Sequence, residues 1–364
     1  MRVVRQLLAA IVLLGLAAPA GAQTREVNVF NWSDYIDPKA IERFQAESGI
    51  HVRYDVYDSL ETLEGKMLAG HSGYDVVVPT SEPTFSRLIR AGALQPLDRA
   101  KLPNLANLDP ELMARVAASD PGNRFGAIYL WGTTGLGMDP GKVAKLAPGA
   151  PIDSWDLLFK PENARRIAPC GITMLDSATD VIPSVLHYLG HDPDSVSAAD
   201  LADAERALLA IRPFIRAFAS GGAIEQLASG ETCLALDYSG DVIQAAVRAK
   251  EAAKGVVVKY VLPKEGAQIA FDMLAIPKDA PHPGEALAFI NFMLQADVMA
   301  GVTNTMRYAN AVPASHSSIA REITEDVGTY PTPDLMARTF TVRAVSPDAT
   351  RARSRMWARF KSGG

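Results

Sequence analysis

The sequence predicts an α/β protein with two lobes, each built on a doubly wound, mainly parallel sheet. From residue 26 onward, short apolar runs alternate with helical patterns, which is typical of a parallel sheet with helices on both faces. The chain has 364 residues, of which 48% are hydrophobic and 21% are charged. This length suggests about two domains, and the composition is sufficient for a large core in each.

The first five predicted elements form a strand–helix–strand–helix–strand unit. They are a strand over 27–31, a helix over 38–48, a strand over 51–56, a helix over 60–69 and a strand over 76–78. The first helix has clear end signals, because Asp37 suits the N-cap, Pro38 the first helical position and Gly49 the stop. The run Val76 to Val78 is apolar without a break, as expected of a strand covered on both faces.

A similar pattern after residue 129 predicts the second lobe. A glycine-rich stretch follows the apolar run 125–129, and strands over 172–175, 234–236 and 256–260 belong to this lobe. A further strand over 269–276 precedes a helix over about 284–295. Periodicity does not locate the point at which the chain returns to the first lobe. Two lobes joined by more than one crossing strand would form a cleft lined by strand ends, where open α/β sheets bind their ligands.

Several function classes are disfavoured by charge and by missing motifs. The formal net charge of −5 argues against a nucleic-acid partner, which requires a basic surface. The chain contains no phosphate-binding loop, and the glycines at 135, 137 and 141 do not have the spacing of a dinucleotide fingerprint. His187 and His191 lack the glutamate of a zinc-binding helix motif. We therefore expect neither a cofactor nor a metal site.

The N-terminus has the order of a secretory signal peptide. Arg2 and Arg5 precede an apolar run over 7–18, and small residues then lead to Ala22. The apolar run is shorter than the ~20 residues of a membrane span. We predict cleavage after Ala22 and a soluble periplasmic product.

The two cysteines, Cys170 and Cys233, are 63 residues apart. An isolated pair in an oxidising compartment favours a structural disulfide over two free thiols. Their spacing does not fit a redox Cys-x-x-Cys motif, and a zinc site would require four ligands.

Acidic and aromatic side chains are predicted to meet at strand ends. The segments 31–35 and 79–82 follow the first and third strands, so they should lie at the same rim. Asp272 interrupts an apolar run, and a buried carboxylate is costly without a cation or several donors. Tyr238 and Asp241 also follow a strand. Because carboxylates accept N–H donors and aromatic faces attract cations, this pattern favours an ammonium ligand.

Each of these residues also has a structural interpretation. Trp32 could belong to the core, Asp34 could cap the following turn and Asp241 could be a helix N-cap. A secreted hydrolase acting through Asp241 and Asp272 is the enzyme alternative. It would require a substrate groove and a positioned water, for which the pattern gives no reason.

Four segments carry a resemblance to a known family. They are VNVFNWSDY at 27–35, YDVVVPT at 74–80, LDRAKLPNLANLDPEL at 97–112 and GDVIQA at 240–245. These segments strongly resemble the periplasmic polyamine-binding proteins, and most of all the putrescine-binding receptors of ABC transporters. The resemblance extends from about residue 27 to residue 361 and includes the closing RARSRMWARFKSG.

The resemblance implies a type II periplasmic binding protein, with two doubly wound α/β lobes around a hinge and the ligand in the cleft between them. Residues 23–132 and about 265–312 would form lobe 1, and residues 133–264 and about 313–364 would form lobe 2. Such a protein is not an enzyme. It captures a protonated polyamine, here putrescine first, as a monomer and delivers it to an inner-membrane ABC permease.

The family's ligand-binding positions correspond to a defined set in this chain. They are Trp32, Ser33, Asp34, Tyr35, Thr80, Asp180, Tyr238, Asp241, Asp272 and Tyr308, with Glu82, Ala270 and Phe271 as additional candidates. The cysteine pair Cys170 and Cys233 matches the family as well.

Five positions depart from the putrescine pattern. Thr80 stands where a serine is usual, Asp180 where a glutamate is typical, Tyr238 where a tryptophan is, Ala270 where an aromatic residue is, and Arg307 where an apolar aromatic residue is. Shorter side chains enlarge the pocket and weaken its fit to a four-carbon diamine. Spermidine, cadaverine and agmatine are therefore alternative ligands.

Overall fold

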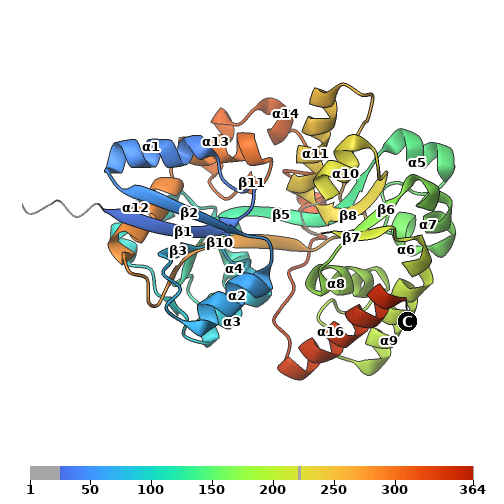
Figure 1. Cartoon of the computed structure of the whole chain (residues 1–364), viewed down its shortest axis with the longest axis horizontal. Coiled ribbons are helices and arrows are strands. Elements are labelled where there is room, and N and C mark those ends of the chain that lie inside the picture. The colour runs from blue at the N-terminus through green and yellow to red at the C-terminus, as the bar shows by residue number, and fades with distance from the viewer. Residues whose placement is uncertain (1–24, 220–222, 364) are drawn as a thin grey trace, which may run out of the picture.

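The computed structural model describes residues 25–219 and 223–363. The predicted signal peptide, residues 1–22, and its cleavage site after Ala22 lie outside the described residues. Within them, one continuous mixed sheet has the strand order β2-β1-β3-β10-β5-β8-β6-β7, with β4 on β10 and both β9 and β11 on β5 (Figure 1). The strands are β1 (Glu26–Trp32), β2 (His51–Tyr57), β3 (Val76–Val77), β4 (Leu94–Gln95), β5 (Gly126–Met138), β6 (Ile172–Leu175), β7 (Ala217–Ala219), β8 (Leu234–Tyr238), β9 (Lys259–Val261), β10 (Ile269–Pro277) and β11 (Ala309–Asn310).

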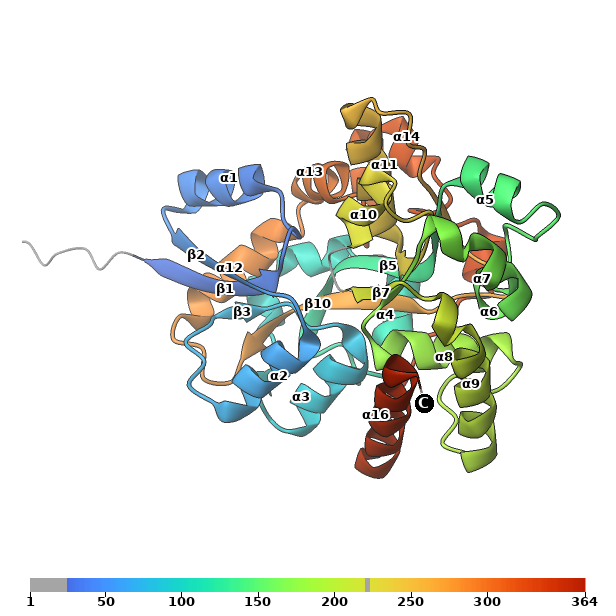
Figure 2. The ribbon, with the colours of Figure 1, turned by 45° about the vertical axis from the view of Figure 1, so that its right-hand side comes forward.

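Helices cover both faces of this sheet, as the two views in Figures 1 and 2 show. They are α1 (Pro38–Ser48), α2 (Leu60–Ala69), α3 (Ser86–Arg90), α4 (Pro110–Val116), α5 (Pro140–Leu146), α6 (Asp156–Phe159), α7 (Pro161–Ile167), α8 (Ala178–Tyr188), α9 (Ala198–Ile211), α10 (Ala223–Ser229), α11 (Ser239–Ala252), α12 (Pro283–Met293), α13 (Ala296–Met306), α14 (Arg321–Thr324), α15 (Pro333–Met336) and α16 (Pro347–Ser362). A short helical segment, η1 (Ser81–Phe85), follows β3.

Two large hydrophobic clusters divide the molecule into halves, which we call lobe 1 and lobe 2. The lobe 1 core draws on residues between 27 and 131 and between 269 and 312, and includes Phe44 of α1 packed edge-on against Phe289 of α12 at 5.2 Å. The lobe 2 core draws on residues between 136 and 267 together with Met356, Trp357 and Phe360 of α16. Burial of these apolar faces is the main stabilising contribution in each half.

Strand β5 runs through both lobes (Figure 1). Its first part pairs antiparallel with β10 of lobe 1, up to the pair Thr133 and Ile269, and its last five residues, from Thr134 to Met138, pair with β8 of lobe 2. The lobes are therefore joined through the backbone ladder of one strand as well as through loops.

The structure confirms much of the predicted secondary structure and corrects parts of it. The helices over 38–48 and 60–69 and the strand over 172–175 have the predicted bounds. The sheet is mixed, because β10 and β5 run antiparallel to their neighbours. The predicted strand over 256–260 is β9, Lys259–Val261, which begins three residues later.

The glycine-rich stretch over 132–137 is the second half of β5 and not a separate feature. A Cβ atom on Gly135 would lie 2.4 Å from the Tyr260 hydroxyl, and one on Gly137 would lie 2.7 Å from the Val242 side chain. These glycines allow neighbouring elements to approach the strand closely, which periodicity cannot reveal.

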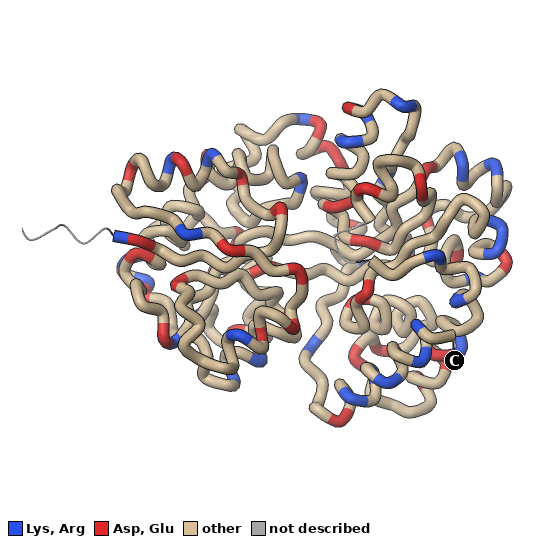
Figure 3. The backbone as a smooth tube through the Cα atoms, viewed as in Figure 1, with Lys and Arg blue, Asp and Glu red and all other residues tan. Residues whose placement is uncertain are grey.

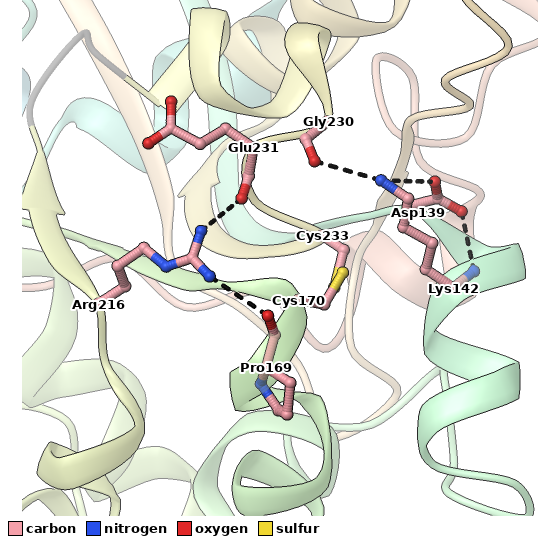
Figure 4. Close-up of a disulfide and its surroundings, with 8 residues drawn as sticks. All are labelled: Asp139, Lys142, Pro169, Cys170, Arg216, Gly230, Glu231 and Cys233. Atoms are coloured by element: carbon pink, nitrogen blue, oxygen red, sulfur yellow. Dashed lines mark hydrogen bonds and ion pairs between the residues drawn. A yellow bond between two sulfur atoms is a disulfide. The ribbon is translucent and has the colours of Figure 1, made fainter.

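The predicted disulfide between Cys170 and Cys233 is present (Figure 4). It joins the end of the segment after α7 to the residue before β8, and Cys233 is fully buried. The Arg216 guanidinium donates to the carbonyl oxygen of Glu231 at 2.6 Å and to that of Pro169 at 3.4 Å. The two chain segments are thus held together next to the bridge by polar contacts as well.

No single helix in residues 25–219 and 223–363 is long and apolar enough to cross a membrane. Helices α12 and α13 together meet the same length and composition test, with a bend of 76° between them, and both contribute buried side chains to the lobe 1 core. Basic and acidic residues are interspersed along the backbone of both lobes in the view of Figure 3.

Candidate functional site

Asp272 lies in β10 beside the ends of β1 and β3. The Tyr35 hydroxyl donates to Asp272 Oδ2 at 2.7 Å, and the Thr80 hydroxyl donates to Oδ1 at 2.7 Å. Thr80 and Asp272 also form a single backbone bridge, which extends the sheet beyond β3. Burial raises the pKa of Asp272 to about 6, although the two hydroxyl donors act in the opposite direction.

Asp180 occupies the first turn of α8 in lobe 2 and is 7% exposed. Its Oδ2 atom accepts hydrogen bonds from the Ser177 hydroxyl and, at 3.0 Å, from the Tyr238 hydroxyl. Its Oδ1 atom accepts one from Gln268 Nε2 at 3.1 Å. Burial raises the pKa of Asp180, and the hydroxyl donors partly offset this.

Asp241 occupies the first turn of α11, where the helix dipole favours an anion. The Tyr308 hydroxyl donates to Asp241 Oδ1 at 2.8 Å. Burial raises the pKa of Asp241 to about 6, while the Tyr308 bond and the charge of Arg248 lower it.

Tyrosine rings connect these carboxylates across the two lobes. Tyr35 packs edge-on against Tyr308, with 5.0 Å between ring centroids, so that the partner of Asp272 contacts the partner of Asp241. The charge of Asp180 is the smallest of the named causes of the raised pKa of Asp272, which burial dominates. Trp32, at the end of β1, packs against Tyr57 at 4.6 Å on the rim of the same lobe.

The structure thus brings together Tyr35, Thr80, Asp180, Tyr238, Asp241, Asp272 and Tyr308 of the predicted set. Ser33 and Asp34 are exposed, and Ser33 makes a 3.4 Å bond from its hydroxyl to the Tyr57 carbonyl. Asp34 has a φ of 50°, a left-handed conformation that aspartate tolerates in turns. That these residues bind a ligand stays a prediction.

The three additional candidates have different surroundings. Ala270 is partly exposed and pairs with Gly132 of β5. Phe271 is fully buried and packs near Trp131 in the lobe 1 core, at 6.4 Å between ring centroids. Glu82 accepts from the Ser86 hydroxyl at 2.6 Å and from the backbone N–H of Ala344 at 3.0 Å, so its carboxylate is engaged by protein donors.

Two buried polar residues of this region are absent from the predicted set. Asp237 of β8 is 1% exposed, and burial followed by the nearby charge of Asp241 raises its pKa well above the usual range. Gln268 precedes β10, is 3% exposed and contacts Asp180. Both are polar residues beside apolar strand segments, which is the signal that identified Asp272, so the same reasoning could have found them.

The chemistry of this cluster suits a small cation. The side-chain donors to Asp180, Asp241 and Asp272 in the described chain are hydroxyl groups and one amide, all neutral. Asp180 is buried, and Asp241 and Asp272 are partly buried. Carboxylates that are largely withdrawn from water and have no cationic partner retain a strong attraction for one. Residues 25–219 and 223–363 contain no group of three or more His, Cys, Asp or Glu residues arranged to hold a metal ion.

Comparisons with known proteins identify the family. The family profile described as bacterial extracellular solute-binding protein matches residues 39–332. The chain belongs to this family. Among curated relatives of this solute-binding family, the putrescine-binding periplasmic protein SpuD of Pseudomonas aeruginosa is 46% identical over 359 residues, covering 98% of each chain. The putrescine-binding periplasmic protein PotF of Escherichia coli is 46% identical over 344 residues, covering 94% of this chain and 93% of the relative.

Solved structures of solute-binding proteins agree with the fold. One described as a putative spermidine/putrescine ABC transporter from Listeria monocytogenes has a TM-score of 0.81 and 29% identity, covering 93% of this chain and 99% of that one. A spermidine/putrescine substrate-binding protein, PotD of Streptococcus pneumoniae, has a TM-score of 0.78 and 26% identity, with the same coverage. The predicted fold class and the predicted resemblance are therefore confirmed.

Proposed function

We propose that this chain is a periplasmic receptor that captures a protonated polyamine, putrescine first, and delivers it to an ABC permease. The observation that carries the proposal is the cluster of three carboxylates whose side-chain partners are all neutral: Asp180, which is buried, and Asp241 and Asp272, which are partly buried. Two ammonium groups would supply the missing positive charge, and the tyrosine rings would cover the methylene groups between them. The names of SpuD and PotF support putrescine as the ligand to test first.

In this proposal, lobe 1 forms one wall of the site and lobe 2 forms the opposing wall. The lobe 1 residues are Trp32, Ser33, Asp34, Tyr35, Thr80 and Asp272. Contacts between the lobes support a closing motion around the ligand, because the Tyr308 to Asp241 bond and the Glu82 to Ala344 bond both join distant parts of the chain. The lobes would separate when these contacts break.

The proposed lobes follow the two cores. Residues 23–132 and about 265–312 would move as one body, and residues 133–264 with the C-terminal helix would move as the other. The sequence assigns the chain after residue 312 to lobe 2, but Ile319 and Ile323 form a small cluster with Ala300 of α13, which belongs to lobe 1. The chain after residue 312 is therefore divided between the lobes. We place residues 313–330 with lobe 1 and the chain from Arg343 onward with lobe 2, because Arg343 bonds Asp194 of lobe 2.

Export and monomeric action complete the proposal. The mature protein would begin at Gln23 and act in the periplasm as a single chain, without catalysing a reaction. The relatives' names as periplasmic binding proteins support this location. Intact mass of the exported protein and light scattering during size-exclusion chromatography test these two points.

The decisive experiment is native mass spectrometry of the protein as purified, followed by calorimetric titration with putrescine, cadaverine, spermidine and agmatine. A co-purified diamine and saturable binding of putrescine are expected. Small-angle scattering should show a smaller radius of gyration at saturation than without ligand. Absence of binding for all four amines would overturn the proposal.

A further inference from the structure

A cavity of about 50 Å³ lies between the lobes, on the side of the molecule where Figures 1 and 2 show α3, α8 and α16. Lobe 1 contributes Pro83 and Arg87 to its lining, and lobe 2 contributes Arg343 and residues of α8 and α16. Beside it, the Glu82 carboxylate of lobe 1 accepts from the backbone N–H of Ala344 at 3.0 Å. The lining is therefore complete only when the two lobes are held together.

Three arginines line this cavity, and each guanidinium group retains N–H donors that are not in use. Arg87 binds a glutamate of α2 through Nε and Nη2, and Arg343 binds Asp194 through Nε. Arg353 donates to two backbone carbonyl groups, both through Nη2. Within residues 25–219 and 223–363, none of the three Nη1 atoms donates a hydrogen bond. The cavity is thus surrounded by spare donors of positively charged groups.

Arg353 is the least exposed of these arginines. It is 8% exposed, and its Nε atom is buried without a hydrogen-bond partner in the described part of the chain. Burial lowers the pKa of its guanidinium group, although the charges of Asp194 and Asp192 act in the opposite direction. A cation that is withdrawn from water in this way is stabilised by an additional anion nearby.

The chemistry of the cavity favours a carboxylate and disfavours the amine ligand. Guanidinium groups repel a protonated amine, whereas they bind a carboxylate through parallel N–H donors. A water molecule occupies about 30 Å³ in the liquid, so the cavity has room for one carboxylate group and little more.

The carboxylate is better supplied by a docked protein than by a free ion. The glutamate of α2 and Asp194 already offset part of the arginine charge, so a free carboxylate would be held weakly. A carboxylate carried on a protein surface that has already docked is present at a high effective concentration.

We infer that this cavity is the docking position for an aspartate or glutamate side chain of the partner protein that receives the ligand. The carboxylate would contact Arg87 of lobe 1 and Arg343 of lobe 2 together, so the partner would select the receptor with its lobes closed. Pro83, Val342 and Val345, which also line the cavity, would pack against the methylene groups of the inserted side chain. This inference rests on the proposed function and specifies how the partner recognises the loaded receptor.

The test compares putrescine uptake with putrescine affinity. Uptake of labelled putrescine is measured in cells of the source bacterium whose only putrescine receptor is this protein, and affinity is measured by calorimetry on the purified variants. Arg87→Met and Arg343→Met should each lower uptake at least tenfold and change affinity less than threefold. Arg343→Lys retains the charge and should keep uptake within threefold of the parent. Arg321→Met is the control, because Arg321 is exposed and pairs with Glu325 near α14, away from the cavity.

A second pair of variants tests the charge of the partner without removing an arginine. Ser354 is exposed on α16 and lines the cavity. Ser354→Glu would place the receptor's own carboxylate beside the arginines, and it should lower uptake at least tenfold. Ser354→Gln has the same size without the charge and should keep uptake within threefold of the parent. This pair also decides the matter if an arginine variant does not fold.

The remaining outcomes overturn the inference in distinguishable ways. Normal uptake in Arg343→Met and Ser354→Glu would reject the docking position and leave the proposed function intact. An equal loss of affinity and uptake would mean that the arginines only stabilise the closed lobes. Binding of the parent, but not of Arg343→Met, to phosphatidylglycerol vesicles would assign the arginines to a lipid surface instead. A parent that binds no amine would reject the proposed function itself.

Discussion

The Tyr308 hydroxyl donates a 2.8 Å hydrogen bond to Asp241, and the ring of Tyr308 lies directly against the backbone of Gly240. A Cβ atom on Gly240 would approach the ring carbons to 2.2 Å, and one on Gly132 would approach them to 3.0 Å. Two glycines thus make the space that lets a tyrosine of lobe 1 reach a carboxylate of lobe 2. The absence of a side chain at Gly240 and Gly132 is therefore a condition for the Tyr308 to Asp241 hydrogen bond.

Gly240→Ala should therefore weaken polyamine binding at least tenfold, or by about 1.4 kcal/mol. The added methyl group would displace the buried Tyr308 ring and break its bond to Asp241. Gly65→Ala is the control, because Gly65 lies in α2 and a methyl group added there would have no neighbouring atom within 4 Å. Calorimetry should separate the two variants, and equal affinities would refute the coupling.

Asp241→Asn and Asp272→Asn should each weaken putrescine binding by about 2 to 5 kcal/mol. Each variant leaves a desolvated ammonium group without a charged partner. Folding should survive, since both side chains accept their present hydrogen bonds from tyrosine or threonine hydroxyls, which an amide oxygen can also accept. Titration tests the loss, and circular dichroism tests the fold; an unfolded variant would indicate a structural role instead.

Binding should weaken as the pH falls from 7.5 to 5. Burial raises the pKa of Asp241 and of Asp272 to about 6, whereas an alkyl ammonium group remains protonated throughout this range. At pH 5, each carboxylate that must lose a proton on binding should reduce the affinity by about tenfold. Titration in two buffers with different ionisation enthalpies should also detect the release of protons.

In the ligand-free protein, the same two carboxylates should increase the stability of the fold as the pH falls, although binding weakens. Between about pH 4 and pH 6 the folded state retains protons that the unfolded chain releases, so their contribution to the free energy of unfolding rises as the pH falls. Denaturant titrations at pH 5 and 7 of the parent and of Asp272→Asn test this point. The variant should show a smaller pH-dependent difference, and an unchanged difference would contradict the raised pKa.

Ala270→Phe should shift selectivity toward putrescine and away from spermidine. Ala270 is partly exposed on β10, two residues from Asp272, so a larger side chain there should narrow the site. An aromatic face over an ammonium contributes about 0.5 to 2 kcal/mol. Both affinities should be measured at one salt concentration, because screening alters exposed charge contacts. An unchanged ratio would mean that Ala270 does not line the site.

Replacing both Cys170 and Cys233 by serine should lower the free energy of unfolding by about 4 kcal/mol, from the loss of a cross-link that closes a loop of 63 residues. Neither cysteine contacts the carboxylate cluster, so putrescine affinity at 25 °C should change little. Denaturant unfolding and titration measure the two quantities. A large loss of affinity in a folded variant would show that the bridge also shapes the site.

Local signals predict the elements that have strong end residues. The Asp37 side chain caps α1 by accepting from the Lys39 N–H, and Gly49 ends the helix in a left-handed conformation, as the sequence indicates. The same signals do not identify the second half of β5 as a strand. Its glycines are required by the close approach of Tyr260 and Val242, which are distant in sequence. The interruption of an apolar run identifies Asp272, whereas the pairing of Gln268 with Asp180 joins residues distant in sequence, which no local pattern contains.

The central position of β10 has a consequence for how the chain matures. This strand lies between β3 and β5 in the lobe 1 half of the sheet, yet it begins at residue 269, whereas β1 begins at residue 26. Lobe 1 therefore lacks its middle strand until most of the polypeptide has emerged, while most of the lobe 2 core comes from one uninterrupted stretch. Because pairing of distant segments is slow, we expect lobe 2 to acquire structure first and lobe 1 to complete its folding last. If the chain crosses a membrane N-terminus first, β1 and β3 emerge early and remain without their partner β10 until residues 269–277 have also crossed.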